Sequence, residues 1–431
     1  MRGEIKIVIL SSLLWIASSQ NVGVISFSLK PILNYFEIPM DARWLESFIA
    51  SGTNIGMLIG AILSGAIADR FGRKKVIYVS TLIHSISTLL SALSPSAEVL
   101  AFFRFLIGVG VGGALPIIAS LVAEYSSPMR RGKNISIVET FWAVGWLSAV
   151  LLSIIVYMDI EGWRYYMFIS GSISLILVLI SNIKVPESIR YLLSIGRKDD
   201  ANILARIYGV TPPNITKVKF SVLQSVKILL NNEYRLSTLS LWITWFCITM
   251  GYYGIFIWLP SLLDSVSPEI SLYMSSNRYI YLIVITLAQV PGYLSAVYLV
   301  DRVGRKKILS IYLFMTAVSS FLLANSRTVP ELYISGFILS FFDLGAWAAL
   351  YTYTPEQYPT YIRGLGSGWA SSMGRLGGIM GTMIVPWIQV NGDWFNIFLL
   401  FAGVHVIGAI STLFGREYAK MEMPELIVNK A

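Results

Sequence analysis

Residues that build catalytic and metal sites are scarce in this chain. Its 431 residues include one cysteine, Cys247, and two histidines, His84 and His405. A single cysteine excludes an intramolecular disulfide, and the histidines lie alone on apolar stretches without the spacing of metal ligands. The sequence also contains no Walker motif or other nucleotide-binding motif. We therefore expect no metal, no cofactor and no enzymatic activity, and packed or lipid-adjacent roles for both histidines.

Charged residues are also scarce. Only 13% of the residues are charged, 55% are hydrophobic, and the mean hydropathy is +0.67. Soluble domains average about 25% charged residues, so this composition indicates a multispanning membrane protein. An apolar run of about 20 residues is long enough to cross the hydrocarbon core as a helix. The sequence predicts twelve such spans, at residues 7–33, 44–68, 76–94, 97–125, 134–158, 163–184, 236–263, 278–300, 308–325, 328–354, 365–388 and 394–414.

The formal net charge of +9 is sorted by membrane side. The loops on one side of the predicted spans carry few basic residues, whereas the termini and the opposite loops hold nearly all the other lysines and arginines. This distribution follows the positive-inside rule and predicts that both termini are cytoplasmic. We therefore expect a multi-pass protein of the cytoplasmic (plasma) membrane that contacts lipid and binds no nucleic acid. The few basic residues on the outer side are Arg43, Arg164, Arg278 and Arg327.

A charged heptapeptide occurs twice. Asp69–Lys75 reads DRFGRKK, and Asp301–Lys307 reads DRVGRKK, 232 residues later. Such self-similarity indicates two copies of one structural unit, and charged repeats between apolar spans indicate a duplicated membrane transporter. The expected fold is an all-α membrane protein, with twelve transmembrane helices in two pseudo-symmetric six-helix halves. The expected parts are a first half at 1–184, a cytoplasmic linker with amphipathic helices at 185–235, a second half at 236–415 and a cytoplasmic tail at 416–431.

A second charged pattern keeps the same offset, because Glu124 with Arg131 returns as Glu356 with Arg363. Charges that pair across helix ends can hold one conformation closed and release it when the helices move apart. The alternative is plain anchoring of basic loops at the cytoplasmic face. The gate hypothesis assigns Asp69, Arg70, Gly72, Arg73, Glu124 and Arg131 to the first half, and Asp301, Arg302, Gly304, Arg305, Glu356 and Arg363 to the second.

Several motifs together carry a family resemblance. They are DRFGRKK, the glutamate–arginine pairs, RFLIGVG at 104–110 and PESIR at 186–190. With these motifs the chain resembles the major facilitator superfamily, and within it the sugar-porter-related branch that includes organic-ion, niacin-type and synaptic-vesicle-type transporters. Three further segments look closest to prokaryotic metabolite:proton symporters of the niacin-transporter type. They are ETFWAVGW at 139–146, YYGIFIWLP at 252–260 and YTYTPE at 351–356.

The resemblance implies a twelve-helix fold with a central substrate site between two six-helix halves and alternating access. It adds Arg104, Glu187 and Arg190 to the gate residues. Residues 187–230 mix charged and apolar positions at near-helical spacing, interrupted by Pro212-Pro213. This amphipathic segment is similar to the intracellular helices of sugar porters, which implies a latch between the halves; the alternative is a linker that merely tethers them.

Four charged residues lie inside the predicted spans and far from the loops: Arg104, Glu139, Asp343 and Arg375. A charge at bilayer depth costs roughly 2.5–3.5 kcal/mol, so each needs a partner, a water-filled cavity or a function. We expect Glu139 to contact substrate or carry a proton, with a structural salt bridge to Arg104 as the alternative. Desolvation raises the proton affinity of a buried carboxylate, which makes Asp343 the second proton candidate.

Arg375 stands among Gly374, Gly377 and Gly378. A guanidinium that faces a cavity offers a bidentate clamp for a carboxylate or a phosphate. The resemblance supports this hypothesis, because organic-anion transporters of the family carry arginine at the matching position. The alternative is a packing role, in which the glycines allow close helix contact and Arg375 pairs with Asp343.

The first span carries two amides, Gln20 and Asn21, where proton-coupled relatives of the family often have an aspartate. Facilitative sugar carriers have an amide there, which argues against proton coupling through this span. Aromatic side chains are predicted to line the substrate site, although single aromatics more often serve packing or the interfacial belt. The aromatic candidates are Trp142, Tyr252, Tyr253, Trp258, Trp347 and Tyr351.

These patterns predict a monomeric secondary transporter for a small organic anion, an aromatic or other carboxylate metabolite, in symport with protons. The alternative is a facilitative or proton-coupled carrier of a sugar or another neutral solute, which Asn21 and the sugar-porter motifs favour. A third class, a non-transporting membrane sensor built on a transporter fold, has no support in the sequence, since no signalling domain is appended to the spans.

Overall fold

The computed structural model describes residues 2–38, 42–127, 130–156, 161–210, 222–358, 362–389 and 394–417. Within these residues every regular element is a helix. The chain divides into two compact units, Met1–Thr216 and Lys217–Ala431. The boundary falls inside the segment for which the sequence predicts a linker.

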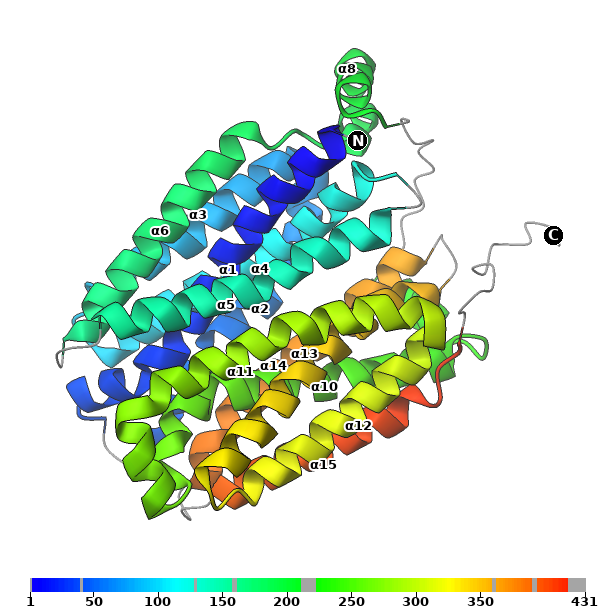
Figure 1. Ribbon diagram of the computed structural model, residues 1–431. Helices are drawn as coiled ribbons and strands as arrows, with labels where there is room; N and C mark the ends of the chain where they lie inside the picture. The colour runs from blue at the N-terminus through cyan, green and yellow to red at the C-terminus, as the bar shows by residue number, and fades with distance from the viewer. Residues whose placement is uncertain are drawn as a thin grey trace. The chain divides into compact units, whose positions relative to one another are not determined.

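Six long helices build the first unit (Figure 1). α2 packs against α4, α1 packs against α5, and α3 lies against both α4 and α6. The helices are α1 (Arg2–Tyr35), α2 (Arg43–Phe71), α3 (Arg73–Ser91), α4 (Ala97–Glu124), α5 (Arg131–Val156) and α6 (Gly162–Lys184).

Six long helices also build the second unit, and they pack in the same pattern. α11 packs against α13 as α2 does against α4, α10 against α14 as α1 does against α5, and α12 against α13 and α15 as α3 does against α4 and α6. The repeat seen in the charged motifs is therefore a repeat of whole six-helix units. The helices are α10 (Arg235–Leu262), α11 (Pro268–Val303), α12 (Arg305–Ala324), α13 (Val329–Glu356), α14 (Arg363–Gln389) and α15 (Trp394–Thr412).

The repeat extends to the residues that start the helices. Ser96 caps α4 by accepting a hydrogen bond from the Val99 amide. At the matching place Thr328 caps α13 and forms a capping box with Glu331. A hydroxyl at this position satisfies amides that have no partner within the helix, so both helices begin at a sequence-defined point.

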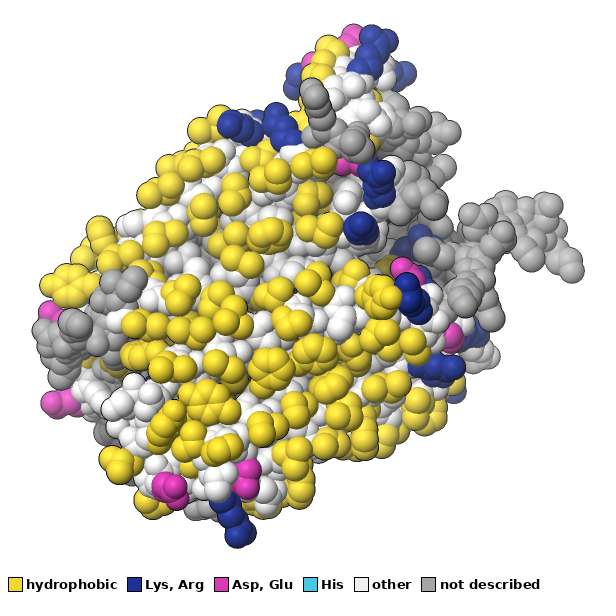
Figure 2. All heavy atoms as spheres, in the orientation of Figure 1, with side chains coloured by type: hydrophobic (Ala, Val, Ile, Leu, Met, Phe, Trp, Pro, Cys, Tyr) yellow, Lys and Arg dark blue, Asp and Glu magenta, His cyan; other side chains and the backbone are white. Residues whose placement is uncertain are grey.

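Apolar side chains cover the flanks of the long helices, while lysine and arginine gather near helix ends and on α8 (Figure 2). Ile183 of α6 and Leu272 of α11, for example, are 76% and 77% exposed. Such a surface suits lipid rather than water. Ten of the described helices are long and apolar enough to cross a membrane. The other two long helices are α3, diluted by serine and threonine, and α14, diluted by glycine; together the twelve correspond to the twelve predicted spans.

Three short helices follow the first six: α7 (Ile189–Ser194), α8 (Lys198–Tyr208) and α9 (Val222–Leu229). α8 is amphipathic, as the sequence predicts, and its buried side includes Ala201 and Tyr208. The Tyr208 ring packs edge-on against Tyr125 at the end of α4, with 4.7 Å between centroids. α8 therefore docks on the first unit; Pro212-Pro213 lies outside the described residues.

Candidate functional site

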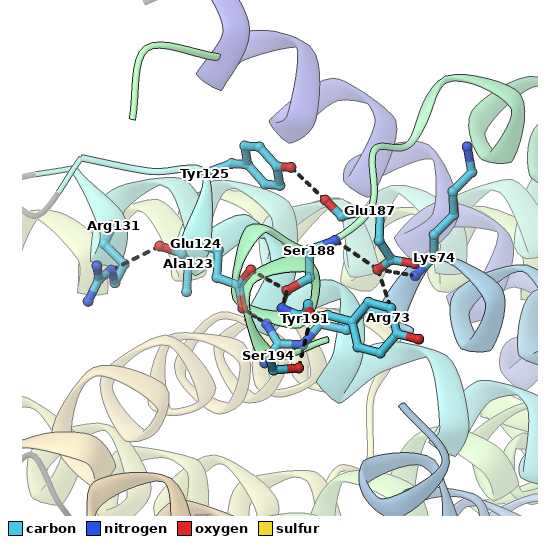
Figure 3. A network of polar contacts seen from close by, with 10 residues as sticks. All are labelled: Arg73, Lys74, Ala123, Glu124, Tyr125, Arg131, Glu187, Ser188, Tyr191 and Ser194. Atoms are coloured by element: carbon cyan, nitrogen blue, oxygen red, sulfur yellow. Dashed lines mark hydrogen bonds and ion pairs between the residues drawn. The ribbon is translucent and has the colours of Figure 1, made fainter. Parts of the chain in front are cut away.

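A carboxylate caps the start of α3 in the first unit (Figure 3). Glu187, which precedes α7, accepts hydrogen bonds at Oε1 from the backbone amides of Arg73 (2.8 Å) and Lys74 (3.1 Å). Helix N-terminal amides lack partners within the helix and favour negative charge, so this contact fixes the segment after α6 to α3. Gly72 makes the turn possible, because its φ of +95° is strained for any residue with a side chain.

Next to this cap, an ion pair joins α3 to α4 (Figure 3). The Arg73 guanidinium contacts the Glu124 carboxylate, and only 19% and 6% of these two side chains are exposed. Ser188 donates a hydrogen bond to the other Glu124 oxygen at 2.7 Å, and Tyr125 donates to the Glu187 carbonyl at 2.6 Å.

The remaining gate candidates of this unit surround the Arg73–Glu124 pair. Asp69 and Arg190 are exposed, and both lie close enough to act on the charge of Arg73. Arg131 donates to the Ala123 carbonyl at 3.0 Å, so the described partner of Glu124 is Arg73 from the heptapeptide. Arg70 lies over the Phe71 ring, with 5.2 Å to its centroid.

The second unit repeats this arrangement with its own residues. Arg305 bonds Asp301 at 2.7 Å on α11 and Glu356 at 3.1 Å on α13. Glu417, which follows α15, accepts a hydrogen bond from the Lys306 amide at 3.0 Å and so caps α12 as Glu187 caps α3. Gly304 again supplies the turn, with φ of +114°. Sequence reasoning did not single out Glu417.

The other two gate candidates of the second unit contact neighbouring groups. Arg302 lies over the Tyr298 ring at 4.0 Å from its centroid. Arg363 lies 3.4 Å from the Tyr358 carbonyl, to which its Nε donates.

A buried polar cluster occupies the interior of the first unit. Asn21 of α1 donates to Ser174 of α6 at 2.8 Å, and its amide nitrogen lies 2.7 Å from Nδ1 of His84 on α3. Arg104 of α4 is completely buried and donates from Nη1 to the Asn21 carbonyl at 3.1 Å. The adjacent Gln20 is 1% exposed. This cluster joins four helices around amides and an arginine, and places His84 inside it.

The α5 candidates lie close to α1 in the same unit. Glu139 is 4% exposed, and Trp142 is half-buried. The Trp142 carbonyl accepts a hydrogen bond from Ser19 at 2.6 Å. Trp146, one turn further along, packs edge-on against Phe27 with 6.4 Å between ring centroids.

Aromatic side chains from α10 and α13 form one continuous cluster in the second unit. The rings of Trp245 and Tyr351 lie 5.2 Å apart, those of Trp347 and Tyr351 5.8 Å, and those of Tyr252 and Trp347 5.8 Å. Tyr253 extends the cluster, 5.1 Å from Tyr252. The structure thus gathers four predicted aromatics and adds Trp245, which sequence reasoning missed.

Arg375 of α14 joins this cluster, because it is half-buried and interacts with the Tyr253 hydroxyl. Glycines bring its helix close to α10: a methyl group added at Gly374 would touch Trp245 and Thr249. The Trp347 indole N–H is buried and has no hydrogen-bond acceptor among the described residues. Trp258 points elsewhere and donates to the Thr382 carbonyl at 2.9 Å.

Asp343 pairs with a histidine. Its Oδ1 lies 3.5 Å from Nε2 of His405 on α15, and both side chains are completely buried. The other His405 nitrogen, Nδ1, lies 2.7 Å from the Phe401 carbonyl. The structure therefore gives Asp343 a partner other than Arg375.

Tertiary contacts, rather than sequence spacing, define the residues that the sequence did not predict. His405 lies 62 residues from Asp343, and Glu417 lies 111 residues from the amide that it caps. Glu417 falls two residues before the position that the 232-residue offset from Glu187 indicates. A search for acidic residues near that offset could have found Glu417, whereas no local signal marks His405 or Trp245.

Two repeated six-helix units, an apolar outer surface and repeated charged helix ends define a membrane transporter. The chain matches the family described as "Sugar (and other) transporter" over residues 17–422, and it belongs to this family. It is 39% identical to the niacin transporter NiaP of Acinetobacter baylyi over 414 residues, 94% of this chain and 92% of that protein. It is 34% identical to a putative niacin/nicotinamide transporter NiaP of Bacillus subtilis, with 95% of each chain covered.

A solved structure supports the same fold. The partially occluded inward-open form of the xylose transporter XylE from E. coli superposes with a TM-score of 0.78, covering 95% of this chain and 97% of that chain at 20% identity. The twelve helices described above are therefore those of the major facilitator fold, and the chain is a multi-pass membrane transporter.

Proposed function

We propose that this protein is a secondary active transporter that moves a small organic anion, an aromatic or other carboxylate metabolite, by alternating access in symport with protons. It works as a monomer in the cytoplasmic membrane with both termini inside the cell. The charge distribution of the loops supports this orientation. Glu139 and Asp343 are the candidate proton carriers.

The arginine beside the aromatic cluster carries the proposal. Arg375 supplies a planar cationic fork, which binds carboxylates bidentately. Tyr252, Trp347 and Tyr351 supply flat apolar surface beside it, and the Trp347 N–H supplies a donor. A flat ring that ends in a carboxylate matches this combination, because the ring stacks on aromatics while the charge meets the guanidinium.

The relatives point to the same chemistry. The Acinetobacter baylyi relative is named for niacin, which is an aromatic carboxylate. Its coverage extends over nearly the whole chain, so the aromatic cluster and Arg375 fall within the matched length. Niacin and compounds of the same shape are therefore the first substrates to test.

A sugar or another neutral solute is the second candidate, and the first unit favours it. The amide oxygens of Gln20 and Asn21 are buried and receive no hydrogen bond from the described residues. Amide groups with unused hydrogen-bonding capacity suit hydroxyl groups better than they suit an anion.

The gates support alternating access. Arg73–Glu124 and Arg305–Glu356 are ion pairs at equivalent helix ends of the two units. Each joins the ends of two helices of its unit, and a separation of those ends would break the pair. Ion pairs that are only partly exposed resist this separation without preventing it.

Uptake into proteoliposomes tests the proposal. Labelled nicotinate, benzoate, xylose and choline are compared, with and without an inward proton gradient. We expect uptake of the carboxylates, stimulated by the gradient, and no uptake of choline. Uptake of xylose alone would establish the sugar alternative, and uptake of no compound above empty liposomes would contradict both.

A further inference from the structure

A carboxylate and an imidazole, those of Asp343 and His405, face each other inside the second unit. Both side chains are 0% exposed, and 3.5 Å separates Oδ1 from Nε2. Neither carboxylate oxygen of Asp343 has a hydrogen bond that meets normal geometry with the described residues. A buried carboxylate without such bonds is costly in free energy when it is charged, which favours its protonated form.

The Phe401 carbonyl settles which imidazole nitrogen can exchange a proton. A carbonyl oxygen only accepts hydrogen bonds, so the 2.7 Å contact requires a hydrogen on Nδ1 of His405. Nε2 is then the nitrogen that gains or loses a proton, and it faces Asp343. The backbone of α15 thus orients the imidazole toward the carboxylate.

The elements packed around the pair supply few other ionisable groups. α10 places Gly251 against the imidazole ring, where a methyl group would overlap it, and carries Cys247 and Tyr252 on either side. α12 contributes Tyr312, which packs against Phe342 beside Asp343. α11, which packs against α13, carries the neutral and buried Gln289, and Arg375 of α14 interacts with Tyr253. Among the described residues, His405 is the ionisable group that acts on the Asp343 charge.

We propose that Asp343 and His405 together form the proton-binding site of this transporter, with one proton held between Oδ1 and Nε2; this inference rests on the proposed proton symport. With that proton the pair is neutral, as an ion pair or as an acid beside a neutral imidazole. Without it, one negative charge remains in a buried place. Burial therefore favours the protonated pair, and contact with water favours release.

The position of the pair connects it to the aromatic cluster. Asp343, Trp347 and Tyr351 recur at i, i+4 and i+8, so they lie along one face of α13. Tyr252, which contacts Trp347, is next to Gly251, which contacts His405. A substrate that moves the aromatic rings would therefore move the helices that bury the pair.

Histidine-selective nitrogen NMR tests the pair without any substrate. The chain contains only two histidines, so a protein labelled with 15N-histidine in lipid nanodiscs gives two pairs of ring-nitrogen signals, Nδ1 and Nε2 of each imidazole, and His405→Gln identifies one pair. We expect Nε2 of His405 to change its protonation with pH. In Asp343→Asn the response of this nitrogen to pH is expected to change, because the imidazole loses its carboxylate partner. A His405 signal that ignores pH, or that titrates identically in Asp343→Asn, overturns the proposal.

Transport of labelled nicotinate in proteoliposomes tests the coupling role. The measured quantity is the ratio of accumulation driven by a pH gradient to exchange without a gradient. We expect this ratio to fall at least about tenfold in His405→Gln, since one pH unit is worth a factor of about ten. Ser411→Ala is the matched control, because it removes a buried hydrogen bond between the same helix and α10, 2.9 Å long, without removing an ionisable group.

The outcomes separate this inference from the proposed function. If the wild type is not driven by the gradient, the symport proposal fails and the pair has no coupling role. If the wild type is driven and His405→Gln keeps the wild-type ratio, the pair is excluded while symport stands. If the ratio of gradient-driven accumulation to exchange falls in Glu139→Gln but not in His405→Gln, the proton coupling belongs to the first unit.

Discussion

At the scale of single residues, the side chains that matter are those whose charge is held near apolar or aromatic groups. Arg375 is half-buried and interacts with Tyr253, beside rings that present flat surfaces. A guanidinium is more weakly hydrated than an ammonium and presents its donors in one plane. The residue therefore suits recognition of a planar carboxylate in a way that lysine does not.

Arg375→Ala is expected to weaken carboxylate binding by a hundredfold or more, since losing a charge-assisted hydrogen bond in a partly buried site costs several kcal/mol. Arg375→Lys is expected to recover only part of that affinity, because it lacks the planar fork. The measurement is the concentration of nicotinate that half-saturates exchange. Arg327→Ala, at an exposed position before α13, is the control. Unchanged affinity in Arg375→Ala would return the residue to a packing role.

At the scale of helices, the charged contacts at the helix ends differ in strength, as the two contacts of Arg305 in the second unit illustrate. Asp301 is 72% exposed, and its contact with Arg305 lies along a single helix. Glu356 is 12% exposed, and its contact with Arg305 crosses from α12 to α13. An exposed ion pair within one helix stabilises it by about 0.3–0.5 kcal/mol. Dissolved salt screens the attraction between exposed charges more than that between buried charges. The interhelical glutamates are therefore the stronger parts of the gates.

Glu356→Gln is expected to lower the transport rate more than Asp301→Asn does, and Glu124→Gln more than Asp69→Asn. The physical reason is that each glutamate loses a partly buried contact with Arg305 or Arg73. Initial rates at equal protein per liposome measure the effect. Equal rates for each Glu and Asp variant would show that helix-to-helix pairing does not limit the cycle.

A glycine decides how closely α10 approaches α15. Gly251→Ala is expected to displace the His405 ring, because the added methyl group overlaps it. Overpacking of this kind costs about 1–3 kcal/mol. We expect a lower midpoint of thermal unfolding in detergent and a shifted 15N signal for His405. Gly403→Ala, on α15 with open space around it, is the control and is expected to change neither quantity.

At the scale of the whole molecule, the two units share a packing pattern but differ in what they bury. The first unit buries Arg104 among the amides and hydroxyls of its polar cluster. The second buries Asp343 with His405 and carries Arg375 beside aromatic rings. The duplication thus preserved the helix framework, while each interior acquired a separate set of polar groups.

One proton taken up with one carboxylate moves no net charge through the protein. We therefore expect nicotinate uptake driven by a pH gradient to be insensitive to an imposed membrane voltage, although 100 mV is worth about 2.3 kcal/mol for each charge moved. Potassium gradients with valinomycin set the voltage, and initial uptake is measured at fixed pH on both sides. A rate that rises when the interior is made negative would indicate more than one proton per anion.

Most of the framework could be predicted from the sequence, because spans follow from apolar length and the repeat follows from charged motifs. Even α3 and α14, whose hydropathy is diluted by small residues, could be placed because each begins at a repeated basic residue, Arg73 or Arg363. The pairing of side chains could not be predicted. The sequence suggests Arg375 as the partner of Asp343, whereas the fold brings Nε2 of His405 on α15 to 3.5 Å from the Asp343 carboxylate.

The carboxylate caps of α3 and α12 show what a duplicated gene retains. Glu187 and Glu417 bond the amides of Lys74 and Lys306, which are equivalent residues, yet the two glutamates are not at equivalent positions in the sequence. The same requirement, a carboxylate at the start of this helix, is therefore met from two different segments of the chain, the one before α7 and the one after α15. A comparison of the two halves by the 232-residue offset pairs Glu187 with residue 419, and therefore misses the structural counterpart that the hydrogen bond to Lys306 identifies.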